Sequence, residues 1–152
     1  MIIKFYDLKK FNLNSVNYYL FYGRNLGLIE DTINNIFKSF FSKSITRYEE
    51  SEILTNTSEF KESIINKSFF ENEKFIIINR VSDKLFEIIK EIIERDCDGI
   101  KIILKASSLE KKSKLRSFFE KQKELICIPV YPDTDQILSN LTMKFFREKK
   151  IS

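Results

Sequence analysis

The chain contains no histidine, which removes the side chain that most often acts as a general base or as a metal ligand. Its 152 residues include only two cysteines, Cys97 and Cys127, and these lack the CxxC spacing of a zinc site. Both lie in segments with the pattern of folded elements, so we expect buried free thiols in a reducing cytosol and no disulfide. These absences disfavour catalysis and a zinc site. We expect a domain that is not an enzyme by itself and that binds no metal and no cofactor.

Long hydrophobic runs are also missing. Charged residues interrupt the apolar start MIIKFYDLKKF, and no small-residue cleavage site follows it, so this segment predicts neither a signal peptide nor a membrane span. The net charge of +4, from 26 basic and 22 acidic residues, permits nucleic acid binding without demanding it. With 43% hydrophobic residues, the chain is long enough for one domain with a substantial core, and we expect a cytoplasmic protein.

Apolar runs and helical periodicities alternate along the chain. Strands are expected at 18–22, 44–48, 74–81, 100–106 and 125–131, and helices at 29–41, 57–67, 83–95, 112–123 and from 133 almost to the end. The third and fourth strands have unbroken apolar cores, typical of strands buried on both faces, and Pro129 indicates that the last strand lies near an edge or ends early. This alternation predicts a three-layer α/β fold, in which helices cover both faces of a five-stranded, mainly parallel sheet.

The first strand ends at Gly23, where a parallel fold of this kind would bind its ligand. A phosphate-binding loop would carry glycine, lysine and a hydroxyl residue at positions 28 to 30, but the chain has Leu28, Ile29 and Glu30. We expect Glu30 and Asp31 to cap the following helix themselves and to repel phosphate. A purely structural interpretation, in which Gly23 forms a turn before an acidic helix cap, is therefore favoured over a nucleotide site.

The third strand ends in Asn79 and Arg80, where an ATPase would carry the carboxylates that hold magnesium. A phospho-accepting receiver domain would need an aspartate there and acidic residues after the first strand, in place of Tyr22 and Gly23. Both classes of site are disfavoured.

Two adjacent phenylalanines, Phe69 and Phe70, stand between polar residues in the segment NKSFFENEK. Neighbouring side chains diverge on a helix and on a strand, so a single core seldom accepts both rings. For a generic domain we favour one ring in the core and the other against a neighbouring helix. The alternative is that an exposed ring anchors an interface with another protein.

A basic segment follows the fourth strand and contains Lys111, Lys112, Lys114 and Arg116. By default these residues form a solvated face. The functional alternative is that they contact phosphates or an acidic partner surface.

Three stretches together resemble a known family. YYLFYGRNLGLIED, SFFENEKFIIINRV and ASSLEKKSKLRSFFE follow one another in the order and spacing of the N-terminal domain of the delta subunit of the bacterial DNA polymerase III clamp loader. The chain departs from that family at Arg24 and Asn25, one of which would usually be acidic. The resemblance implies an AAA+/P-loop-like domain without a working nucleotide site over residues 1–140. Residues 141–152 would begin a connection to a missing lid and collar region.

The resemblance also implies a role for the phenylalanine pair. In the family an apolar pair at this position docks into a hydrophobic pocket on the sliding clamp (beta subunit) and helps to open the ring. Phe69 and Phe70 occupy this position, and Ile65 is expected to join them. Further implied partners are the gamma/tau ATPase subunits and the delta-prime subunit, with DNA reached through the complex and no membrane involved.

Two alternatives remain open. One is a nucleic-acid-binding domain that uses the basic helix 111–123 as a phosphate track, with binding that weakens steeply as salt is added. The other, ranked last, is a divergent P-loop enzyme, which nucleotides would stabilise against heat.

Overall fold

The structure, a computed structural model, describes residues 1–37, 45–67, 74–95 and 99–130. Five strands form one sheet: β1 (Tyr18–Tyr22), β2 (Ile45–Glu49), β3 (Lys74–Asn79), β4 (Ile100–Ala106) and β5 (Leu125–Pro129). The α-helices are α1 (Leu26–Ile36), α2 (Glu50–Thr55), α3 (Thr57–Lys67), α4 (Phe86–Arg95) and α5 (Lys114–Lys121). Short 3-10 turns are η1 (Phe5–Lys10), η2 (Leu13–Ser15) and η4 (Asp83–Leu85). The predicted α/β fold is confirmed.

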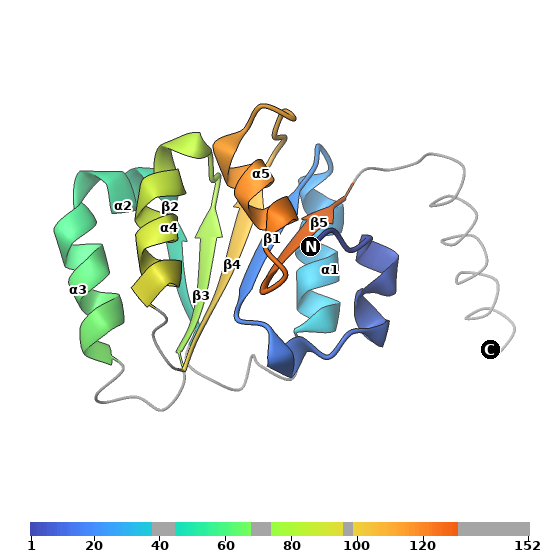
Figure 1. The fold of residues 1–152 in the computed structure, drawn as a ribbon, viewed down its shortest axis with the longest axis horizontal. Coiled ribbons are helices and arrows are strands. Elements are labelled where there is room, and N and C mark those ends of the chain that lie inside the picture. Colours follow the sequence, from blue (N-terminus) through green and yellow to red (C-terminus); the bar gives the residue numbers. More distant parts are fainter. Residues whose placement is uncertain (38–44, 68–73, 96–98, 131–152) are drawn as a thin grey trace, which may run out of the picture.

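The sheet has the strand order β2-β3-β4-β1-β5, and each of its four pairings is parallel (Figure 1). After β1 the chain crosses to β2 at one edge, returns through β3 and β4, and passes β1 again to reach β5 at the other edge. β5 is thus an edge strand that ends at Pro129, as the proline predicted. Backbone hydrogen bonds of Ile3 and Met1 with Cys127, both 2.9 Å, cover part of its outer edge.

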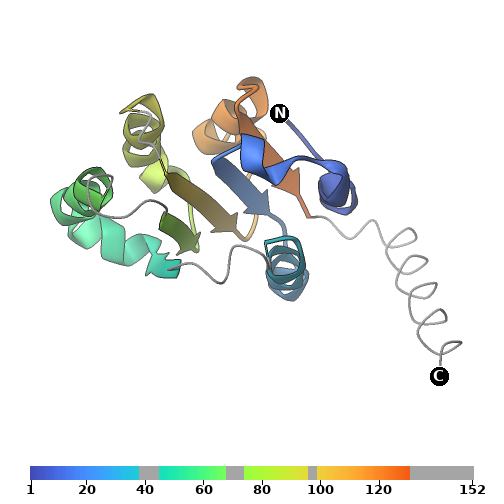
Figure 2. The same ribbon diagram turned by 90° about the horizontal axis from the view of Figure 1, so that it is seen from below.

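The core has two halves, one on each face of the sheet, because successive strand residues point to opposite sides. On one face Tyr18, Leu20 and Tyr22 of β1 join the apolar residues of α2, α3, α4 and α5. On the other face Tyr19 and Phe21 join α1 and the N-terminal turns. Figure 2 shows α3, α4 and α5 on one side of the sheet and α1 on the other.

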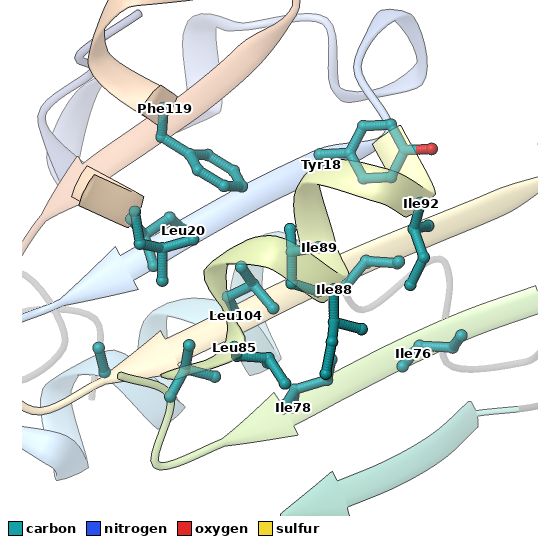
Figure 3. Close-up of a cluster of buried hydrophobic side chains, with 14 of the residues drawn as sticks. Tyr18, Leu20, Ile76, Ile78, Leu85, Ile88, Ile89, Ile92, Leu104 and Phe119 are labelled. Carbon is teal, nitrogen blue, oxygen red and sulfur yellow. The ribbon is translucent and has the colours of Figure 1, made fainter. Parts of the chain in front are cut away.

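Helix α4 illustrates how the sequence pattern creates this packing. Ile88, Ile89 and Ile92 recur at helical spacing, are at most 8% exposed, and face Ile76 and Leu104 on the sheet (Figure 3). Burial of one such side chain contributes about 1.5–3 kcal/mol to stability. The apolar stripe therefore fixes α4, and with it the end of β3, against the sheet.

The beginning of α1 differs from the prediction. The helix starts at Leu26, and Asn25 caps it by accepting a hydrogen bond from the amide of Leu28 at 3.0 Å. Glu30 and Asp31 lie beyond the first turn, so the expected acidic cap is wrong. The side-chain oxygen of Asn25 determines where the helix begins. Gly27 interrupts the apolar pattern at this point, so the pattern did not reveal the start of the helix.

The segment before α3 also differs. Residues 50–55 form a separate helix, α2, which was not predicted. Thr57 is the first residue of α3, and its hydroxyl donates to the carbonyl of Ile53 at 3.1 Å.

Several predictions fall outside the described residues: the helix from position 133, the boundary between 1–140 and 141–152, and Cys97. Cys127 is free and fully buried, as expected for one of the two thiols. Burial, assisted by the charge of Glu120, raises the pKa of the Cys127 thiol to about 12.

Candidate functional site

The carboxyl ends of the strands line a groove of about 780 Å³, at the place where parallel folds of this type bind ligands. Helix α1 contributes Leu26 and Glu30, β2 contributes Glu49, β3 contributes Asn79, and β4 contributes Lys105. The chemistry of these five residues decides what the groove can bind.

The lysine that lines this groove, Lys105, is already paired. Lys105, whose side chain is 14% exposed, donates to the carboxylate of Glu30, and Arg47 lies 3.5 Å from the same carboxylate. A polyphosphate would have to displace Glu30 and approach its negative charge. The arrangement therefore disfavours nucleotide binding for a reason that motif comparison alone did not reveal.

The loop at Gly23 is closed by neighbouring backbone. The amide of Gly23 donates to Ala106 at 3.2 Å, and the amide of Val130 donates to Tyr22 at 2.8 Å. A Cβ atom at Gly23, where φ is +157°, would lie 2.1 Å from the carbonyl oxygen of Val130. This glycine is needed because the backbone after β5 passes directly over it, and its amide is not available to a phosphate.

Asn79 and Arg80 line the groove, as their position at the end of the third strand predicted. The Asn79 amide donates to Glu49 at 3.5 Å, and the exposed guanidinium of Arg80 lies 3.8 Å from the same carboxylate. Arg80 adopts a left-handed backbone conformation, with φ of 55°. Within the described ranges, no group of three or more Cys, Asp or Glu residues could hold a metal ion.

The four residues of the basic segment have different environments. Lys111, Lys112 and Lys114 are exposed, whereas Arg116 is largely covered. The Arg116 guanidinium donates to Glu120 at 2.7 Å and to the carbonyl of Leu109 at 2.8 Å. It also lies over the ring of Tyr22, 5.0 Å from the centroid. Arg116 thus holds α5 against the sheet, and the three lysines form the exposed charge.

The amino end of α5 carries its own anion. Asp83 accepts hydrogen bonds from the Ser113 hydroxyl and from the amides of Lys114 and Leu115, the latter two at 3.3 Å. Burial alone would raise the pKa of Asp83, but these hydrogen bonds, with the charge of Lys114, lower it overall. A phosphate at this helix end would compete with a resident carboxylate.

The predicted phenylalanine pair lies outside the described residues, as does the side chain of Ile65. The structure describes the elements that precede and follow the pair: α3 ends at Lys67, and β3 begins at Lys74. We call the connecting residues 68–73 the tip segment. The tip segment leads into Lys74, the first residue of β3. Its attachment therefore lies where the strands begin, at the end of the sheet opposite the groove (Figure 1).

Helix α3 is firmly attached to the body of the domain. Phe60 and Ile64 are 4% and 0% exposed, and they belong to the core half shared with α4. The ammonium of Lys61 pairs with Glu91 on α4. Both described elements beside the tip segment, α3 and β3, therefore belong to the packed domain.

The family model for DNA polymerase III, delta subunit, matches residues 19–129, which run from β1 to β5 and make up well over half of the chain. The chain belongs to the DNA polymerase III delta subunit family. A comparison with curated proteins found no match.

Membership in the delta subunit family confirms the resemblance seen in the three sequence stretches. Delta subunits are components of the clamp loader, which acts in DNA replication, and are not themselves catalytic subunits. The matched region includes the tip segment and the groove. None of the helices in the described part of the chain is long and apolar enough to cross a membrane.

Sequence reasoning missed the Glu30–Lys105 pair and the capping role of Asp83. The first had a signal, since a lysine inside the apolar strand sequence IKIILKA needs a partner when that strand is buried. The second had none, because Asp83 and Ser113 are 30 residues apart and meet only in the folded chain.

Proposed function

We propose that this delta-subunit domain binds the sliding clamp through its tip segment, with Phe69 and Phe70 as the anchors and Ile65 beside them. The observation that carries the proposal is the family match over residues 19–129, a range that includes the tip segment and its two flanking elements. Adjacent aromatic residues between two well-packed elements, α3 and β3, suit a hydrophobic pocket, because aromatic anchors dominate the energetics of many interfaces.

Ring opening in this proposal is a shift between closed and open clamp. The domain can favour the open ring only by the difference between its affinities for the two forms. A well-anchored α3 suits this role. Because a rigid scaffold does not deform on binding, the binding energy can instead shift the clamp toward its open form. The core residues Phe60 and Ile64 and the Lys61–Glu91 pair supply that anchorage.

The chemistry of ATP belongs to neighbouring subunits in this proposal. The Glu30–Lys105 pair fills the position where a phosphate would need a free cation, and backbone contacts close the Gly23 loop. The gamma/tau ATPase subunits and the delta-prime subunit would assemble with this domain, and polymerase activity would be a property of the holoenzyme.

The test is binding of the cognate clamp by Phe69→Ala and Phe70→Ala variants, measured by surface plasmon resonance. We expect each truncation to weaken binding by about 2–4 kcal/mol, because each removes an aromatic anchor. Thermal unfolding should match that of the unaltered chain. Tyr6→Ala is the matched control, since it removes a 41% exposed aromatic ring far along the chain from the tip segment.

Two results would contradict the proposal. If both phenylalanine variants are folded and bind the clamp normally, the tip segment is not the contact. If a variant unfolds, that ring belongs to the core.

A further inference from the structure

A smaller cavity, which we call the α2–α3 pocket, lies between β2, α2 and α3. It measures about 220 Å³, and Tyr48, Ile53 and Phe60 form its apolar wall. The rings of Tyr48 and Phe60 meet edge to face, with centroids 5.0 Å apart and planes at 82°. Ile53 and Phe60 are 1% and 4% exposed, so this wall is fixed by the core.

Two exposed carboxylates, Glu52 and Glu59, stand at the pocket. Neither has an ion-pair or hydrogen-bond partner among the described residues. Glu50 and Glu91, in contrast, have partners. The carboxylate of Glu50 accepts a hydrogen bond from the backbone amide of Ser82 at 2.7 Å, and that of Glu91 pairs with Lys61. The pocket therefore combines an aromatic wall with two negative charges that no side chain among the described residues neutralises.

This combination suits the side chain of an arginine or a lysine. The aliphatic stem would lie against Tyr48, and the charged end would meet Glu52 and Glu59. The pocket volume of about 220 Å³ is many times the roughly 10–15 Å³ that one water needs, so the pocket has room for a long side chain. Arginine fits best, because its planar guanidinium both stacks on aromatic rings and pairs with carboxylates.

The position of the pocket indicates which partner supplies that side chain. Glu59 and Ser63 line it from α3, the helix that ends at Lys67 immediately before the tip segment. With a rise of about 1.5 Å per residue, these two residues lie roughly 12 Å and 6 Å from the end of the helix. A standard interface of about 800 Å² per partner is about 30 Å across, so an interface that includes the end of α3 can also reach the pocket.

We propose that the α2–α3 pocket is a second contact with the sliding clamp, which inserts a cationic side chain between Glu52 and Glu59. This inference rests on the proposed function. The tip segment supplies the apolar anchor, and the pocket adds a charged contact at the margin of the interface that orients the clamp.

The test compares clamp binding by the full chain with that of the Glu52→Gln/Glu59→Gln double variant, at about 0.05 M and about 0.5 M salt. Glutamine keeps the size of each side chain and removes its charge. We expect about 3- to 10-fold weaker binding at low salt and a much smaller difference at high salt, because salt screens the charge pairs. A Ser63→Phe variant, designed to fill the pocket, should weaken binding at both salt concentrations.

The matched control is Glu110→Gln/Glu124→Gln. It removes the same net charge from two exposed glutamates that flank α5, on the side of the sheet near β5. Normal binding by this control together with weaker binding by the pocket variants supports the inference. Equal weakening by the control overturns it, since the effect is then one of net charge.

The tip variants separate the two proposals. If Phe69→Ala and Phe70→Ala weaken binding while the pocket variants bind normally, the pocket inference fails and the proposed function stands. If the unaltered chain does not bind the clamp, or the tip variants bind normally, the proposed function fails and the inference fails with it.

Discussion

Replacement of Gly23 by alanine tests how closely the backbone after β5 covers the loop after β1. The new Cβ would lie 2.1 Å from the Val130 carbonyl oxygen, whereas Cβ atoms in proteins essentially never come within 3.0 Å of such an atom. The backbone after β5 must therefore move by about 1 Å, at the cost of the Val130–Tyr22 hydrogen bond. The φ of +157° adds strain of its own for alanine.

These contributions set the expected magnitude. A lost backbone hydrogen bond costs about 1 kcal/mol and an unfavourable backbone conformation about 1–3 kcal/mol, so Gly23→Ala should lower the free energy of unfolding by roughly 2–4 kcal/mol. Urea unfolding followed by circular dichroism measures this change as a lower midpoint with an unchanged slope.

Gly27→Ala is the internal control. Its Cβ would meet only the side-chain oxygen of Asn25, at an ordinary 3.5 Å, and it lies inside α1. Alanine is favoured over glycine in helices by up to about 1 kcal/mol, so this variant should be as stable as the unaltered chain or more so. If Gly23→Ala is as stable as Gly27→Ala, the explanation of the closed loop is refuted.

Two further substitutions test the polar contacts. Glu30→Gln should lower stability by about 1–2 kcal/mol, because it leaves the largely buried Lys105 without its carboxylate, whereas exposed Glu94→Gln should change little in the same urea titration. Asp83→Asn should cost about 0.5–1 kcal/mol at neutral pH through loss of a charged cap on α5. Because folding lowers the pKa of Asp83 from 3.8, its stabilisation is present above that pH and is lost as pH falls through the folded pKa. A difference between Asp83→Asn and the unaltered chain that persists unchanged at lower pH would contradict this account.

The strands were predictable because each carries its own signal. An unbroken run such as FIII in β3 can be buried on both faces only within a covered parallel sheet, and the structure places all of it in the core. Helices with a strong apolar stripe, such as α4, were predictable for the same reason. Their placement required no knowledge of distant residues.

Helix ends and charge partners were harder to predict. The start of α1 depends on one hydrogen bond from Leu28 to Asn25, and α2 is too short for a full apolar period. Glu30 was assigned to the wrong role because its true partner, Lys105, lies 75 residues away in the chain. Such contacts depend on strand order, and the sequence constrains strand order only loosely.

The same was true of the candidate site. Family resemblance pointed to Phe69 and Phe70, but the α2–α3 pocket exists only because Tyr48 of β2 meets Phe60 of α3. No local motif links these residues, and the helix that supplies Glu52 was not predicted. The pocket could therefore be recognised only in the folded domain.

The groove and the tip segment should act independently, because they are attached at opposite ends of the strands. A double variant can measure this independence. The six residues of β3 span about 20 Å, so the Glu30–Lys105 groove and the attachment of the tip segment lie at opposite ends of the same strand. Effects of changes more than about 10 Å apart normally add. In the Glu30→Gln/Phe70→Ala double variant, the loss of stability should therefore equal that of Glu30→Gln alone, and the loss of clamp affinity that of Phe70→Ala alone. A clamp affinity that responds to Glu30→Gln in a chain that remains folded would show that the groove communicates with the tip segment, and a passive scaffold would then be the wrong description of this domain.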